Sequence, residues 1–233
     1  MTRRFLTTAA AVSVAVLSAA SPAIAAAQTW NAVTDFSSTQ SGAWTYGSTG
    51  SLGGTFTQMT NYNSSCGGNS SLQCWSIGSY PNGQAVIHNS ASTNQGIDPP
   101  GMLNVDPQNG YAVVRWTAPT DGMFSVAGTF RSLDQYGTEV YVLGNSSTLF
   151  SGTLGGTTGS SASQTTSFNF SEMFTSGSTI DFVTHSSTGP SFRGTGLAAT
   201  ITASDLTTTP EPSSLALLGT GLIGLVPMVR RRR

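Results

Sequence analysis

Short runs of alternating apolar and polar residues dominate the middle of this chain of 233 residues. In residues 112–117, Ala112, Val114 and Trp116 fall on one face of an extended strand, because successive strand side chains point to opposite faces. Similar runs bounded by Gly, Pro, Asn, Asp or Ser follow at 123–130, 139–143, 148–154, 166–170, 179–183 and 197–201. This spacing predicts an all-β fold, an antiparallel β-sandwich or jelly roll, with Trp116 in the core.

The stretch from residue 28 to residue 107 has a weaker pattern. Strands are expected at 43–46, 54–59 and 85–88, and the long connections between them are candidate binding loops. Residues 119–122 and 144–147 have turn compositions, and residues 172–174 are expected to form one brief helical turn.

The N-terminus has the three parts of a secretory signal peptide. Arg3 and Arg4 precede an apolar run, and small residues then reach Ala27. Cleavage after Ala25 or Ala27 fits, and the alternative of a permanent membrane helix is opposed by Pro22, which breaks helices. Residues 1–27 are therefore expected to direct residues 28–206, the β-sandwich, to the Sec export machinery.

Charge excludes some partners of the exported part. Residues 28–209 contain no lysine, three arginines and nine acidic residues, a formal charge of −6. Nucleic acids and anionic lipids need clustered cations, so neither is an expected ligand of this domain.

Cys66 and Cys74 are the two cysteines of the chain. In an exported protein such a pair indicates a disulfide that closes a small loop. Two thiolates without a nearby histidine leave a zinc ion short of ligands, so the metal alternative is weak.

The C-terminus ends in an apolar segment followed by cations. Residues 213–229 carry no charge and would span ~25 Å as a helix, which is enough for a thin bilayer. Arg230, Arg231, Arg232 and Arg233 would hold its end on the cytoplasmic side, with the domain outside. Residues 207–212 form a polar linker that ends in Pro210, Glu211 and Pro212.

The Pro-Glu-Pro triplet, the apolar helix and the arginine cluster together resemble the PEP-CTERM sorting signal of Gram-negative bacteria, a tail also catalogued as an ice-binding protein C-terminal domain. The resemblance implies that exosortase recognises Pro210, Glu211 and Pro212 and removes the tail. Before that removal the protein would be held briefly in the inner membrane, and afterwards it would be at the cell surface or outside the cell. The alternative is an ordinary membrane anchor.

Part of the β-rich region resembles a carbohydrate-binding-module-like jelly roll. The segments that carry the resemblance are 112–119, 122–130, 138–143, 149–154 and 178–183. It implies sugar binding, although Gly144–Ser147 departs from the tight Asn-Gly hairpin that is usual there.

Sugar binding needs exposed aromatic rings beside polar groups. Tyr62, Trp75 and Tyr80 lie among Asn and Ser residues near the two cysteines and are the candidate binding residues. The alternative is that Trp75 packs on the disulfide. The Thr-rich stretch 200–204 has too few T-x-T rungs for a flat ice-binding face.

No catalytic constellation is evident in the sequence, and we expect no enzyme. His88 and His185 are isolated, and a residue at the end of a strand is the better interpretation of His88. Asp134 and Glu139 are the nearest pair of carboxylates for a glycosidase. No cofactor is expected, although a structural calcium ion could bind loop carboxylates, the candidates being Asp98, Asp106, Asp121 and Asp134.

Three functions remain open. The first is a non-enzymatic surface protein that binds extracellular polysaccharide. The second is a purely structural or adhesive protein, and the third is a secreted glycan-degrading enzyme.

Overall fold

The computed structural model describes residues 27–156, 164–186 and 194–204, which belong to one compact unit, Ala27–Leu206. The sorting triplet, the expected membrane helix, the terminal arginines and nearly all of the expected signal peptide lie outside the described residues. Among the described residues, no helix has both the length and the apolar character needed to span a membrane.

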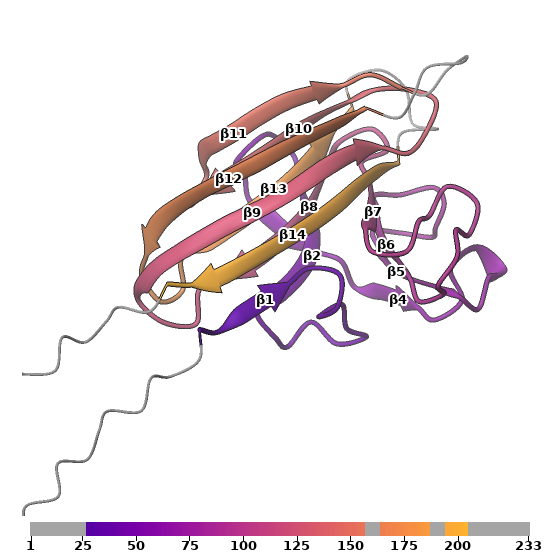
Figure 1. Ribbon diagram of the computed structural model, residues 1–233. Helices are drawn as coiled ribbons and strands as arrows, with labels where there is room; N and C mark the ends of the chain where they lie inside the picture. Colours follow the sequence, from indigo (N-terminus) through magenta and orange to yellow (C-terminus); the bar gives the residue numbers. More distant parts are fainter. Residues whose placement is uncertain (1–26, 157–163, 187–193, 205–233) are drawn as a thin grey trace, which may run out of the picture. The chain divides into compact units, whose positions relative to one another are not determined.

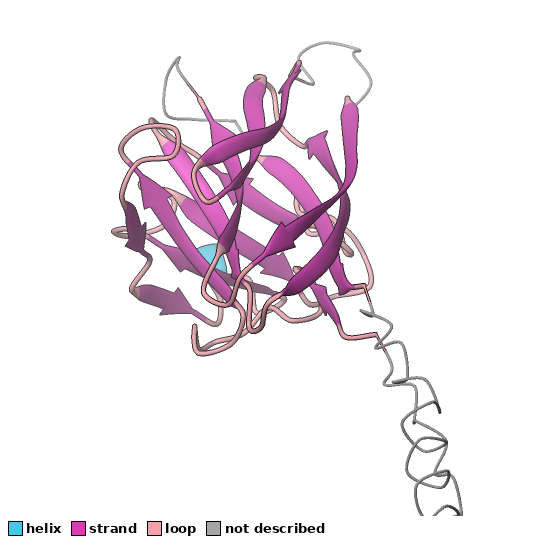
Figure 2. Cartoon of the chain, turned by 90° about the vertical axis from the view of Figure 1, so that its left-hand side faces the viewer, coloured by secondary structure: helices cyan, strands magenta, loops and turns pink. Residues whose placement is uncertain are grey.

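Two antiparallel sheets face each other (Figures 1 and 2). The larger sheet has eight strands in the order β12-β9-β14-β7-β6-β5-β4, with β1 also paired to β14. Its strands are β1 (Thr29–Asn31), β4 (Asn61–Asn63), β5 (Leu72–Ser76), β6 (Ala85–Asn89), β7 (Leu103–Asp106), β9 (Gly122–Ser132), β12 (Thr165–Phe174) and β14 (Thr195–Ala203).

The smaller sheet has six strands in the order β11-β10-β13-β8-β2-β3. Its strands are β2 (Trp44–Thr49), β3 (Phe56–Gln58), β8 (Tyr111–Thr117), β10 (Thr138–Gly144), β11 (Ser147–Leu154) and β13 (Thr179–His185). The short turn drawn in cyan in Figure 2 is η1 (Cys66–Gly68), the helical element among the described residues.

The main core fills the space between the sheets. Trp116 is fully buried there and packs edge-on against Trp30 and Phe124, with ring centroids 5.3 and 5.0 Å apart. Alternation along each strand places these side chains in the core. Val114 lies two residues before Trp116 on β8, and Phe182 is opposite Val114 on β13, so all three face the same way. The expected core position of Trp116 is confirmed.

The predicted all-β sandwich is confirmed, and so are the strands predicted from residue 112 onward. The helical turn expected at 172–174 is wrong, because Glu172–Phe174 continue β12 and pair with β9. The turn at 144–147 is a tight two-residue hairpin, in which Asn145 and Ser146 take positive φ values of 48° and 70°. The strands β1, β4, β5 and β7 were not predicted.

Candidate functional site

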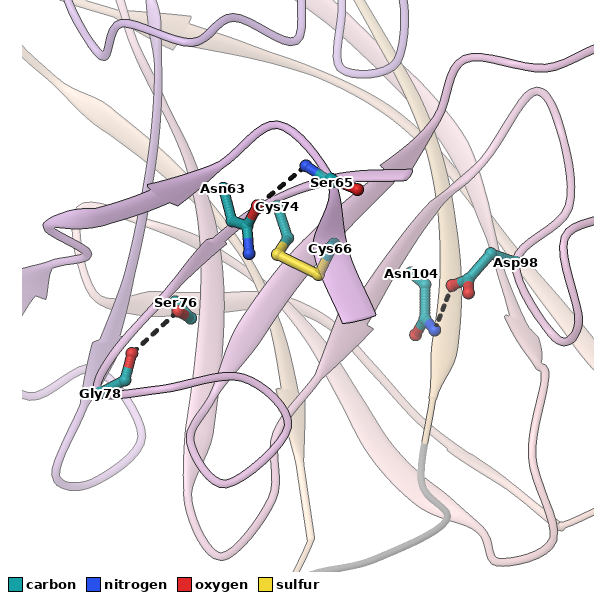
Figure 3. The surroundings of a disulfide bond; sticks show 8 residues. All are labelled: Asn63, Ser65, Cys66, Cys74, Ser76, Gly78, Asp98 and Asn104. Carbon is teal, nitrogen blue, oxygen red and sulfur yellow. Dashed lines mark hydrogen bonds between the residues drawn. A yellow bond between two sulfur atoms is a disulfide. The ribbon is translucent and has the colours of Figure 1, made fainter. Parts of the chain in front are cut away.

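The predicted disulfide between Cys66 and Cys74 is present, with their Cα atoms 5.7 Å apart (Figure 3). It joins η1 to β5 on the outer face of the eight-stranded sheet, where it packs with Leu72, Ala85 and Ile87. Asn63 Oδ1 accepts a hydrogen bond from the Ser65 amide at 2.8 Å, which shapes the chain that enters η1. The disulfide therefore fixes the loop between β4 and β5.

Tyr62, Trp75 and Tyr80 are not brought together on one surface. Trp75 is buried in the main core, and its indole nitrogen donates to the Ser37 carbonyl at 2.8 Å. Tyr62, half-buried, lies opposite Trp75 on β4, with ring centroids 5.2 Å apart. Tyr80 packs on the disulfide side of the sheet, so Trp75 is not the residue that covers the disulfide.

Three of the four candidate calcium ligands, Asp98, Asp106 and Asp134, interact electrostatically with one another. Burial raises the pKa of Asp106 to about 6, with smaller contributions from the charges of Asp134 and Asp98. Asn104 Nδ2 donates to Asp98 Oδ1 at 2.7 Å (Figure 3), whereas Asp121 accepts a bond from the Ser176 amide. In the described part of the chain no group of three or more His, Cys, Asp or Glu side chains could hold a metal ion, so calcium binding stays an untested prediction.

His88 lies in β6 and stacks on Phe36, with ring centroids 4.9 Å apart. Burial lowers its pKa. Its place next to the last residue of β6 agrees with the interpretation of His88 as a residue at the end of a strand.

A cluster of four side chains occupies the outer face of the six-stranded sheet, away from the core. It consists of Tyr111 on β8, Glu139 and Tyr141 on β10, and His185 on β13, and we call it the Glu139 cluster. Strand pairing places Tyr111, His185 and Glu139 in one row, because Glu139 is opposite His185 and His185 is opposite Tyr111.

Stacking and hydrogen bonds hold the Glu139 cluster together. The Tyr111 and His185 rings are nearly parallel, at 10°, with centroids 3.9 Å apart. Glu139 Oε2 lies 2.9 Å from His185 Nδ1 and accepts a hydrogen bond from the Tyr141 hydroxyl at 3.0 Å. The bonds from His185 and Tyr141 hold the pKa of Glu139 below its usual range, while burial and the bond to Glu139 raise the pKa of Tyr141 to about 12.

Asp134 and Glu139, the nearest pair of carboxylates for a glycosidase in the sequence, have different surroundings in the structure, and their use in catalysis stays untested. The carboxylate of Glu139 is engaged by His185 and Tyr141, and Asp134 interacts electrostatically with Asp98 and Asp106.

The Glu139 cluster rests on a small apolar layer. Val113, Leu143 and Val183 are buried beneath the half-buried rings of Phe56, Tyr111 and Tyr141. Glu139 stays accessible, since 44% of its side chain is exposed. The arrangement therefore presents aromatic surface and a carboxylate side by side.

An ion pair lies further along the same face. Arg115 on β8 donates two hydrogen bonds to Asp181 on β13, Nε to Oδ1 at 2.7 Å and Nη2 to Oδ2 at 2.8 Å. Its guanidinium also lies 4.1 Å from the centre of the Phe56 ring. Both contacts hold the Arg115 guanidinium against other groups of the protein.

Tyr111 and Tyr141 were not among the candidates from the sequence. The alternation along the strands is the pattern that could have indicated them. Tyr111, Tyr141 and His185 alternate with the core positions of their strands, which are mostly apolar. Aromatic side chains at such positions on three strands indicate a face with a role besides core packing.

Residues 208–233 match the PEP-CTERM protein-sorting motif. This confirms the resemblance of the tail, and a motif of this kind implies export, processing by exosortase and sorting to the cell surface. No curated protein matches the sequence.

Several solved structures show distant similarity to the β-sandwich. A family 35 carbohydrate-binding module from Clostridium thermocellum has 10% identity and a TM-score of 0.29, over 43% of this chain and 75% of that one. A module of the same family from Paenibacillus barcinonensis has 18% identity and a TM-score of 0.27, over 44% and 78%. An isomalto-dextranase from Arthrobacter globiformis, solved with panose, has 10% identity and a TM-score of 0.29, over 69% and 23%. Similarity at this level does not indicate a shared ligand.

Proposed function

We propose that residues 28–206 form a non-enzymatic glycan-binding domain of an exosortase-processed protein of a Gram-negative bacterium. The protein is held briefly in the inner membrane and then acts at the cell surface or outside the cell, where it binds extracellular polysaccharide. The observation that carries the proposal is the Glu139 cluster, in which half-buried tyrosine rings flank an accessible carboxylate.

The chemistry of this surface suits a sugar. Pyranose rings have apolar C–H faces that pack on aromatic rings, and hydroxyl groups around the rim that hydrogen-bond to polar side chains. Tyr111 and Tyr141 supply the rings, and Glu139 supplies an acceptor that is ionised at neutral pH, as an ordinary glutamate is and the more so with its lowered pKa. Because the rings rest on buried valine and leucine side chains, little conformational entropy is lost when a ligand binds.

The test is a calorimetric titration of the purified full chain with soluble bacterial and plant polysaccharides. Replacing Tyr141 by Ala should weaken binding about three- to tenfold, the contribution of one aromatic stacking contact. Tyr80→Ala, in the loop between β5 and β6 beside the disulfide, serves as the matched control and should leave binding unchanged. Circular dichroism shows that each variant is folded.

The outcomes separate the remaining functions. Loss of binding in Tyr80→Ala but not in Tyr141→Ala would place the site near the disulfide, as the sequence predicts. Absence of binding to every polysaccharide would favour the structural or adhesive protein. Release of new reducing ends during the titration would instead identify an enzyme.

A further inference from the structure

Among the described residues, the outer face of the six-stranded sheet has no arginine or lysine free to bind an acidic sugar. Arg115 is the arginine on this face among the described residues, and both its hydrogen bonds go to Asp181, which is nearly fully buried. The stacking of its guanidinium against Phe56 occupies one face of that group as well. A uronate carboxylate would therefore have to displace Asp181, which would leave a buried charge without its partner.

Glu139, in contrast, has one carboxylate oxygen that can still accept hydrogen bonds. Both of its hydrogen bonds end on Oε2, so Oε1 has no hydrogen-bond partner among the described residues. A carboxylate oxygen can accept two hydrogen bonds, so Oε1 is available to a ligand. The direct neighbours of the Glu139 carboxylate are the Tyr141 hydroxyl and the His185 imidazole, and that imidazole stacks on the ring of Tyr111.

The net charge of the described residues is also negative. The described residues include two arginines and no lysine, against eight acidic side chains. This excess of negative charge repels polyanions and attracts cationic ligands at low ionic strength.

We propose that Glu139 selects glycans that carry free, protonated amino groups, such as polymers of deacetylated amino sugars, over neutral glycans, and that the same face rejects polyuronates. This inference rests on the proposed function of the Glu139 cluster. The ammonium group binds at Oε1 of Glu139, while the sugar ring packs beside Tyr141.

The test compares three oligosaccharides of equal length with the purified full chain: glucosamine, N-acetylglucosamine and uronic acid oligomers. It is run at a mildly acidic pH, at which the amino groups of the glucosamine oligomers are protonated and Glu139, whose pKa is lowered, stays ionised. Glucosamine oligomers should bind about two- to fivefold more tightly than the acetylated oligomers at low salt, the range of an exposed ion pair. The preference should shrink at 0.5 M salt because of screening, and uronic acid oligomers should bind most weakly.

Two variants test whether the preference for amino sugars depends on Glu139. In Glu139→Gln, which keeps the shape and the hydrogen bond from Tyr141, the ratio of the two affinities should fall to about one. Glu172→Gln makes the same change at an exposed position of β12 on the other sheet and should retain the wild-type ratio.

Three results would overturn this inference alone: equal affinity for the amino and acetylated oligomers, tightest binding of the uronic acid oligomer, or an unchanged ratio in Glu139→Gln. Absence of binding to all three oligomers and to every polysaccharide of the earlier titration would instead overturn the proposed function, and the inference with it.

Discussion

Removal of the Arg115 guanidinium should destabilise the protein severely, because it leaves the Asp181 carboxylate without its partner. Asp181 lies in the middle of the six-stranded sheet with its side chain 3% exposed, and Arg115 supplies both hydrogen bonds that its carboxylate receives from a side chain. Arg115→Met keeps the apolar stem of the arginine and removes its charge. The perturbation therefore tests the ion pair and leaves most of the packing unchanged.

The magnitude follows from the burial of the two partners. Breaking a fully buried pair costs about 3–5 kcal/mol, but 21% of the Arg115 side chain is exposed, so water can reach this end of the pair. We therefore expect a loss of about 2–3 kcal/mol in the free energy of unfolding, with up to ~1 kcal/mol more from the lost contact with Phe56.

Urea denaturation followed by tryptophan fluorescence measures this loss. A second variant, Arg115→Met with Asp181→Leu, has no unpaired charge and should recover at least half of the lost stability. The reasoning would be refuted if Arg115→Met cost less than about 1 kcal/mol, or if the double variant were as unstable as the single one.

Three further predictions concern stability. Replacing Cys66 and Cys74 by Ser should lower the free energy of unfolding in urea by about 2.5 kcal/mol, the chain-entropy value for a loop with a sequence separation of 8; an unchanged urea midpoint would contradict it. Because the pKa of Asp106 is raised to about 6, its contribution to stability is fully present below about pH 4 and is lost as the pH rises through about 6. Denaturation across this range should show a smaller fall in Asp106→Asn than in the wild type, and equal falls would disprove the assignment. Gly128→Ala should lower the melting temperature through a cost of about 2 kcal/mol, since the added methyl group would clash with the Ala198 carbonyl oxygen, and an unaltered melting curve would count against this packing.

The strands from residue 111 onward could be predicted because their two faces differ so clearly. In β8 the core positions hold Ala112, Val114 and Trp116, while Arg115 occupies the opposite face. The segment Glu172–Phe174 was mistaken for a helical turn because its local composition fits a helix. Pairing with β9 overrides this local preference, as long-range contacts commonly do in sheets.

The strands near the disulfide were missed for a different reason. β4 has three residues and β7 four, too few to show a period, and both are surrounded by Ser, Gly, Asn or Pro. Their pairing depends on neighbours such as β14, which pairs with β7 from the far end of the domain. No local pattern contains that information.

The candidate site was only partly accessible to sequence reasoning. Glu139 and His185 were both noted, but as separate residues 46 positions apart, because the register between β10 and β13 cannot be read from either strand alone. Tyr111 joins them only through the pairing of β8 with β13. The disulfide could be predicted, since it depends on two cysteines close in sequence in an exported chain.

The most direct test of the account is a nuclear magnetic resonance titration of the isotope-labelled protein with a glucosamine oligosaccharide. We expect the largest chemical-shift changes at Tyr111, Glu139, Tyr141 and His185, with little change at Tyr62 and Tyr80. This result would place the ligand on the outer face of the six-stranded sheet. Changes confined to the disulfide loop, or no changes at a saturating concentration, would contradict the proposed site.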